Sequence, residues 1–319
     1  MATAVTAPHP EPRRRSRRSG APAFLLAVPA TLWFVFLFVV PVGLVVTYSF
    51  GTKVAGTPGE IDLDNPGLER YREVLDGPFT EVLRQTMRTS IIGTLLCLLV
   101  GLPVAYFLAF KLSPRARALV LTLLMIPFFT NYLLRTLAWE IVLQPRGFVS
   151  NFLQDGHWFT FGRQLRDSPI QILGTRTAVQ IAIVYNYLPL MIFPVWVALD
   201  RVEPHLVEAS KDLGAGRLRT LLQVTLPLAA PGIVAGLVLV FVPLSGDYVT
   251  AALLGGAQGN MLGAEVANQY FNAQNPAAGS AIAVSLIMSI LLVVAGVAAF
   301  AWFLRRLLRA NRRVRRVRA

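Results

Sequence analysis

The chain has 319 residues, of which 55% are hydrophobic and only 15% are charged, and its formal net charge is +13. Soluble domains usually carry about a quarter charged residues, so this composition indicates a protein that folds in lipid. A positive charge alone would suit nucleic-acid binding. The basic residues instead cluster in 13–18 and 305–318, directly beside long apolar segments, where they usually face the cytoplasm and anionic lipid. The sequence therefore predicts membrane lipid, and not nucleic acid, as a partner.

Six uncharged, apolar stretches are long enough to cross a bilayer, whose hydrocarbon core of about 30 Å needs about 20 helical residues. The N-terminal stretch is similar to a secretory signal, but it extends over residues 19–52, whereas the apolar core of a signal has about 7–15 residues. We expect it to remain as an uncleaved first helix. The predicted spans are 24–48, 87–110, 117–138, 178–199, 228–247 and 281–304. The expected fold is therefore all-α and integral to the membrane.

The distribution of basic residues predicts which ends of the spans face the cytoplasm, because Lys and Arg are enriched on that side. Twenty of the thirty basic residues lie in the two tails, the turn after the second span and the 200–219 loop. Nine lie in the opposite loops, which are 51–88, 140–176 and 247–280. We therefore predict that both termini are cytoplasmic.

The remaining composition limits what the chain can do by itself. Residues 21–306 are expected to form one membrane domain, with 1–20 as a disordered basic tail and 307–319 as a second basic tail. Cys97 is the single cysteine, so no intrachain disulfide can form. The sequence has no Gly-rich phosphate-binding loop that ends in Gly-Lys-Ser/Thr, and no hydrolase or zinc-protease motif. We therefore expect no enzyme activity and no metal or cofactor bound by this chain.

The loop over residues 200–227 carries the strongest pattern in the chain. Pro204 suits the first turn of a helix, and Gly214 and Gly216 suit a helix end and a turn. We therefore predict two short amphipathic helices on the cytoplasmic face. The acidic and basic residues of the loop balance each other: Asp200, Glu203, Glu208 and Asp212 against Arg201, Lys211, Arg217 and Arg219. A mixed-charge amphipathic helix suits a protein partner better than an anionic lipid surface.

Part of this loop resembles the cytoplasmic signature of bacterial ABC-importer permeases. The family pattern is Glu-Ala-Ala, three residues, Gly, nine residues, Ile, one residue and Leu-Pro. This chain has the same spacing in Glu208-Ala209-Ser210, Gly214, Val224, Leu226 and Pro227. It departs from the pattern at Ser210, which replaces the second Ala, and at Val224, which replaces Ile.

The resemblance implies a type I importer permease fold in which the loop forms a coupling helix that docks into a cleft of a separate ATPase. It implies that Glu208 contacts the ATPase, that Gly214 permits the turn and that Leu226-Pro227 begins the fifth span. The full set expected to serve coupling is Glu208, Ala209, Ser210, Asp212, Gly214, Leu226 and Pro227. ATP would be used by that partner subunit.

Other segments resemble the spermidine/putrescine subfamily of these permeases, over roughly residues 85–300. They are residues 126–130, 134–136, 138–139, 185–189 and 254–256. The resemblance implies a polyamine solute, with an opine, an amino acid or another small organic solute as alternatives. The implied partners are ABC ATPase subunits, a second permease subunit, identical or different, and an extracytoplasmic solute-binding protein. The implied location is the inner (plasma) membrane.

Charged residues within spans are costly in lipid and are therefore functional candidates. Asp247, at the outer end of the fifth span, suits a polycation and resembles an acidic position in some putrescine permeases; alternatively, it caps the span at the water interface. Arg135 and Glu140, in and beside the third span, line the path or form an ion pair with each other or with a neighbouring subunit. Three tyrosines line the path or belong to an interfacial aromatic belt: Tyr185, Tyr187 and Tyr248.

Two other classes of membrane protein remain as alternatives. A secondary transporter would take up its solute with an ion gradient and without an ATPase, but it leaves the loop signature unexplained. A sensor or assembly factor would show neither solute uptake nor a co-purifying ATPase.

Overall fold

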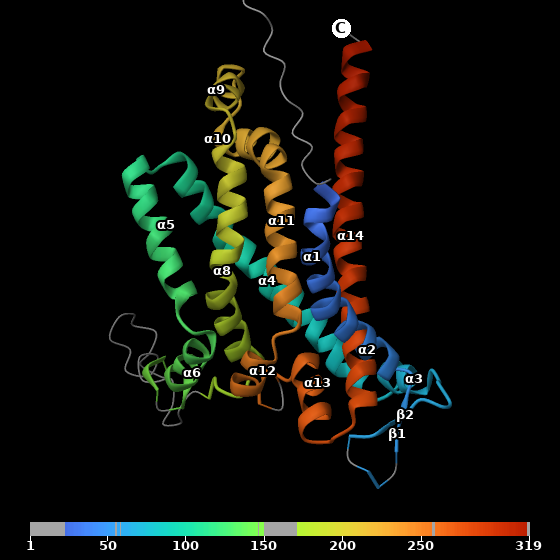
Figure 1. Cartoon of the computed structure of the whole chain (residues 1–319). Coiled ribbons are helices and arrows are strands. Elements are labelled where there is room, and N and C mark those ends of the chain that lie inside the picture. Colours follow the sequence, from blue (N-terminus) through green and yellow to red (C-terminus); the bar gives the residue numbers. More distant parts are fainter. Residues whose placement is uncertain are drawn as a thin grey trace, which may run out of the picture. The chain divides into compact units, whose positions relative to one another are not determined.

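The computed structural model describes residues 23–317 except 55, 58, 146, 150–170 and 257–258 (Figure 1). The predicted N-terminal tail and much of the 140–176 loop therefore lie outside the described residues. The chain divides into two compact units, Met1–Leu44 and Val45–Ala319, and each is described by itself.

The described part of the first unit, residues 23–44, is apolar helix. It contains α1 (Ala23–Phe34), the π-helical segment η1 (Val35–Val39) and the start of α2 (Val40–Tyr48). Pro41 explains the π-helical turn, because a proline has no N–H and its ring collides with the carbonyl four residues before it. In η1 the N–H of Val40 donates instead to the carbonyl of Val35, five residues back, which widens the turn just before the proline.

The second unit is also mainly helical. Its elements are β1 (Thr52–Lys53), β2 (Ile61–Asp62), α3 (Glu69–Asp76), α4 (Phe79–Phe110), α5 (Pro114–Phe129), α6 (Tyr132–Leu143), α8 (Arg176–Asp200), α9 (Pro204–Asp212), α10 (Arg217–Thr220), η3 (Leu221–Thr225), α11 (Leu226–Ser245), α12 (Tyr248–Leu254), α13 (Leu262–Phe271) and α14 (Pro276–Val317). The two short strands pair antiparallel, with Thr52 opposite Asp62. This hairpin is the single exception to the all-α expectation among the described residues.

The core of the second unit lies where α4, α8 and α11 meet. Small residues allow this close contact: a Cβ at Gly93 of α4 would lie 2.9 Å from Ile183 Cγ2 of α8 and 3.2 Å from Leu244 Cδ1 of α11. Further along α4, a Cβ at Gly101 would lie 3.1 Å from Met191 Cγ of α8. Because lipid provides no hydrophobic driving force between helices, such close van der Waals packing is what holds membrane helices together.

The third predicted span, 117–138, is not one continuous helix, and this expectation is corrected. α5 ends at Phe129, α6 begins at Tyr132, and their axes differ by 89°. Thr130 is extended, and the side chain of Asn131 accepts a hydrogen bond of 2.8 Å from the N–H of Leu133, so Asn131 caps α6. A short polar pair within an apolar stretch therefore ends one helix and starts another.

The last predicted span, 281–304, belongs to a longer helix. α14 begins at Pro276, where Asn275 caps the first turn by accepting from the N–H of Ala278 at 3.2 Å, and it extends to Val317. The residues expected to be a basic tail are thus helical up to Val317, and the 247–280 loop contains α12 and α13. Among the described residues, five helices are long and apolar enough to cross a membrane, or six if the bent pair α5–α6 forms one span.

Candidate functional site

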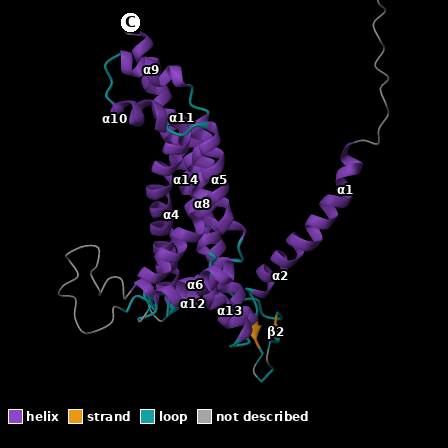
Figure 2. Ribbon diagram, turned by 90° about the vertical axis from the view of Figure 1, so that its left-hand side faces the viewer, coloured by secondary structure: helices purple, strands orange, loops and turns teal. Residues whose placement is uncertain are grey.

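The predicted coupling loop forms α9, α10 and η3 at one end of the second unit, and α6, α12 and α13 lie at the other end (Figures 1 and 2). Pro204 occupies the first turn of α9 and Glu203 the N-cap position. The expected helix, turn and second helix are therefore present in this loop.

Gly214 makes the turn between α9 and α10. Its φ of +81° lies in the left-handed region, which glycine adopts without steric cost. Its N–H donates to the carbonyl of Lys211 at 2.8 Å, and the N–H of Ala215 donates to the carbonyl of Ser210 at 3.1 Å. Gly214 thus ends α9 in the way that glycine commonly ends helices.

Ser210 connects the two halves of the loop. Its hydroxyl lies 3.1 Å from the hydroxyl of Thr220, and Thr220 is buried at the end of α10. The substitution of Ser for the second Ala of the signature therefore adds a contact between α9 and α10. Sequence reasoning did not identify Thr220 as a partner.

The loop presents acidic and apolar side chains to solvent. Glu208, Ala209 and Asp212 are exposed on α9. Leu213, at the tip, is 89% exposed, and Leu218 on α10 is also exposed. Exposed leucines next to charged residues are typical of protein–protein contact surfaces. This end of the unit can therefore accept a protein partner.

The segment before the fifth span repeats the arrangement found around Pro41. α11 begins at Leu226, and η3, a π-helical segment, ends at Thr225, two residues before Pro227. The N–H of Leu226 donates to the carbonyl of Leu221, five residues back. Pro227 therefore enters α11 without a collision with the preceding turn.

Asp247 lies at the opposite end and is buried, with 6% of its surface exposed. Its Oδ1 accepts from the N–H of Thr250 at 3.1 Å, and its Oδ2 accepts from the Thr250 hydroxyl at 2.7 Å and the Tyr132 hydroxyl at 2.5 Å. Asp247 therefore caps a helix other than the fifth span. It caps the short helix α12 inside the protein.

The three candidate tyrosines have different surroundings. Tyr187 is buried, and its ring centroid lies 6.4 Å from that of Tyr132, which places it beside the Asp247 carboxylate. Tyr185 is exposed and packs its ring edge-on against Trp139, at 5.5 Å. Tyr248, which follows Asp247, is also exposed. Of the three candidate tyrosines, Tyr187 is therefore the one that a ring contact with Tyr132 places beside Asp247.

Arg135 stabilises the bend between α5 and α6. Its Nη1 donates to the carbonyl of Pro127 at 2.8 Å, and its guanidinium lies 5.6 Å from the ring centroid of Tyr132. The described residues contain no ion pair between Arg135 and Glu140, so that alternative is not supported. Arg135 holds the carbonyl end of α5 beside the tyrosine that contacts Asp247.

Three residues of this region were not singled out from the sequence. Tyr132 and Thr250 supply the donors to Asp247, from α6 and α12. Asn186, between the two tyrosines of α8, is 2% exposed, and neither polar atom of its amide has a partner among the described residues. The Thr130-Asn131 helix break was the available signal for Tyr132, because it places that residue in the first turn of a new helix.

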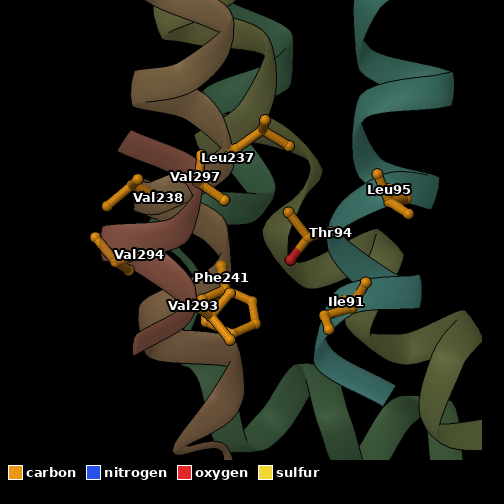
Figure 3. Close-up of a pocket in the computed structure, with 9 residues that line it drawn as sticks. All are labelled: Ile91, Thr94, Leu95, Leu237, Val238, Phe241, Val293, Val294 and Val297. Carbon is orange, nitrogen blue, oxygen red and sulfur yellow. The ribbon is translucent and has the colours of Figure 1, made fainter. Parts of the chain in front are cut away.

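A separate cavity of about 120 Å³ lies between α4, α11 and α14 (Figure 3). Eight of its nine lining residues are apolar, and Thr94 supplies the single hydroxyl. Such a lining suits hydrocarbon rather than a cation, so we do not assign it to the solute. Within the described ranges, no group of three His, Cys, Asp or Glu residues gathers in a way that could hold a metal ion.

Comparisons with known proteins agree with this architecture. A sequence model of the family "Binding-protein-dependent transport system inner membrane component" matches residues 97–309. The spermidine/putrescine transport system permease protein PotB of Escherichia coli K12 is 37% identical over 229 residues, which cover 71% of this chain and 80% of that protein. PotB of Haemophilus influenzae is 32% identical over 262 residues, which cover 82% and 88%.

Solved structures show the same fold at low sequence identity. A bacterial importer of the polysaccharide alginate matches with a TM-score of 0.69 and 16% identity, over 88% of this chain and 94% of the solved chain. The MetNI methionine transporter matches with a TM-score of 0.52 and 17% identity, over 70% and 94%. These likenesses confirm the predicted importer-permease fold. The family match and the PotB relatives, and not these structures, indicate a role in transport. The chain belongs to the family of inner membrane components of binding-protein-dependent transport systems.

Proposed function

We propose that this chain is the permease subunit of an ATP-driven importer whose solute is a polyamine, spermidine or putrescine. The observation that carries the proposal is the 37% identity to a spermidine/putrescine permease over 229 residues. The buried Asp247 carboxylate supports it, because an anionic group within the membrane suits a polycation. Opines, amino acids and other small organic solutes are the competing ligands.

The test is uptake of labelled spermidine and putrescine by cells that lack other polyamine importers. The chain is expressed together with a candidate ATPase, a candidate second permease and a candidate binding protein. Uptake that requires all four proteins, and that an excess of an amino acid or opine leaves unchanged, is expected. Uptake of an amino acid instead would contradict the choice of solute and leave the permease assignment intact. Uptake that persists without the ATPase would favour a secondary transporter.

Coupling to a separate ATPase is proposed to occur through α9 and the turn that follows it. Glu208 and Asp212 supply exposed charges there, and Leu213 supplies an exposed apolar side chain. Closure of the paired ATPases on ATP would pull the coupling helices of the two permeases together. Because the Gly214 turn joins α9 to α10, and α10 continues through η3 into α11, this movement would pass into the membrane helices as a rigid-body rotation. In this arrangement the loop and both termini face the cytoplasm.

The solute path is proposed to pass the Asp247 cluster, defined as Asp247, Tyr132, Thr250 and Tyr187. The carboxylate receives three hydrogen bonds but has no cation beside it among the described residues, so its charge is held in place for an ammonium group. Two tyrosine rings next to it can contact methylene and ammonium groups. An extracytoplasmic binding protein would deliver the solute at this end.

Asn186 extends this proposed path along α8. A buried amide without a hydrogen-bond partner costs free energy, so it is expected where a solute, water or the second permease subunit completes its bonds. The second permease would supply the other wall of the path.

A further inference from the structure

An ion pair joins α5 to α8 beside the predicted coupling loop. Nη1 of Arg117 on α5 donates to Oδ1 of Asp200, the last residue of α8, at 2.5 Å. Three other ion pairs between described residues join positions at most three apart in the chain, whereas these two residues are 83 apart. Three residues separate Asp200 from Pro204, where α9 begins. The pair therefore connects α5 to the start of the predicted coupling helix.

Each partner of this pair is unfavourable at its own place in its helix. Asp200 lies in the last turn of α8, where the negative end of the helix dipole disfavours an acid. Arg117 lies in the first turn of α5, where the positive end of the dipole disfavours a base. Neither residue therefore stabilises its own helix through the dipole. The contact between the two helices, and not the needs of either helix, accounts for both charges.

Arg117 also binds the end of α4. Its Nη2 donates to the carbonyl of Ala109 at 3.1 Å, and α4 ends one residue later, at Phe110. The last carbonyls of a helix have no partner within that helix, so the guanidinium group supplies one. The Arg117 side chain is only 23% exposed, so water and salt screen the ion pair incompletely. One side chain thus joins the ends of α4 and α8 to the start of α5.

α5 extends from this ion pair to the helix break that precedes α6 (Figure 1). No residue of α5 is buried. Leu119 and Leu123 are more than half exposed, and Val120 and Leu124 pack against the core while only partly buried. In contrast, α4, α8 and α11 each bury several residues. Contacts at its two ends therefore position α5 more than close packing along its length does.

The other end of α5 is connected to the Asp247 cluster. The carbonyl of Pro127 accepts from the Thr130 hydroxyl at 2.6 Å and from Nη1 of Arg135 at 2.8 Å. α6 begins two residues after Thr130, at Tyr132, whose hydroxyl donates to Asp247. A shift of α5 would therefore move the helix start that holds Tyr132 against the carboxylate.

We propose that Arg117 and Asp200 are positioning residues for transport, because their ion pair passes the movement of α9 to α5, and α5 passes it to Tyr132 and the Asp247 cluster. The inference rests on the proposed function, which docks an ATPase on α9. Rigid elements joined by ion pairs and hydrogen bonds are the kind of network that carries coupling between distant sites. The state of the ATPase thereby reaches the Asp247 cluster through α5, in addition to the route through α10, η3 and α11.

The test measures the number of solute molecules imported per ATP hydrolysed. Proteoliposomes contain the full-length chain with a candidate ATPase and a candidate second permease, and they receive a candidate binding protein loaded with spermidine. The ratio does not depend on the amount of folded protein, so a merely structural role would not change it. Arg117→Gln and Asp200→Asn are each expected to lower the ratio about tenfold, while the ATPase still co-purifies. Arg115→Gln is the matched control, since Arg115 is exposed on the same turn of α5, and it should keep the wild-type ratio.

A charge exchange separates the role of the pair from that of either residue alone. Arg117→Asp combined with Asp200→Arg restores an ion pair with the charges reversed. Each charge then lies at the favourable end of its own helix, so the exchange should not destabilise α5 or α8. The double variant is expected to recover a large part of the ratio that Arg117→Asp alone loses.

Three results would overturn this role: an unchanged ratio in Arg117→Gln, an equal loss in Arg115→Gln, or an exchange variant that performs no better than Arg117→Asp. If the wild-type chain imports another solute in place of spermidine, the proposed solute is wrong, and the same ratio, measured with that solute, decides the role of the ion pair. A wild-type chain that recovers no ATPase would contradict both the proposed coupling and this inference.

Discussion

The two ends of the second unit hold their candidate residues in opposite ways. At the α9 end the residues are neighbours in sequence, exposed to solvent and positioned by one short helix and a glycine turn. At the Asp247 end they come from α6, α8 and α12, are largely buried and are positioned by hydrogen bonds across more than one hundred residues of chain. Changes at the first end should therefore affect function with little effect on folding, and changes at the second should affect both.

Glu208→Lys is expected to cause the largest loss of uptake without a loss of folding stability. Charge reversal at the centre of a contact surface typically costs several kcal/mol of binding, so uptake should fall at least about tenfold. The thermal unfolding midpoint should not change, because Glu208 is exposed. Uptake and the thermal unfolding midpoint are measured on the same preparation, together with the amount of ATPase that co-purifies.

Glu203→Lys is the control for this variant. Glu203 is also exposed and lies at the N-cap of α9, but outside the signature. Its reversal should leave most of the uptake intact. Normal uptake by Glu208→Lys would contradict the docking role.

At the buried end, Asp247→Ala should reduce both uptake and stability. It leaves the buried N–H of Thr250 without its acceptor, which costs about 1–3 kcal/mol, and it removes one of the two hydrogen-bond partners of the Tyr132 hydroxyl. Asp247→Asn keeps an acceptor and removes the charge, so its unfolding midpoint should lie closer to that of the wild type. If Asn restores stability but not uptake, the charge serves transport; if it restores both, Asp247 is purely structural.

The contrast between the two ends also explains what the sequence could predict. The coupling loop is contiguous, so its helix, its glycine turn and the start of the fifth span followed from local rules at Pro204, Gly214 and Pro227. The apolar spans followed from composition. The Asp247 cluster depends on α6 turning by 89° so that Tyr132 reaches α12, and no local pattern specifies that long-range pairing.

Gly214→Ala tests the turn itself and should have an intermediate effect. No atom lies within 4 Å of the added methyl group, so the cost comes from the φ of +81° alone and should be about 1 kcal/mol. Relaxation of that strain would change the orientation of α9, so uptake should fall a few fold. Gly216→Ala is matched, because it also has open space but a φ of −64°, and it should behave as the wild type does. Equal behaviour of the two variants would show that the left-handed turn is not required.

The smallest effect is expected for Ser210→Ala, which restores the residue of the family signature. It removes the hydroxyl contact with Thr220, and a hydrogen bond at a half-buried position contributes about 0.5–1.5 kcal/mol at most. Uptake should stay near the wild-type level, because the docking surface is formed by side chains that the change does not touch. Thr220→Val should lower the unfolding midpoint more than Ser210→Ala does. Thr220 is buried, and its replacement leaves the Ser210 hydroxyl without its contact to the Thr220 hydroxyl. A loss of uptake in Ser210→Ala as strong as that in Glu208→Lys would contradict this expectation. It would show that the Ser210–Thr220 contact between α9 and α10, rather than the surface of α9, transmits force. The α9 end would then depend on internal contacts, as the Asp247 end does.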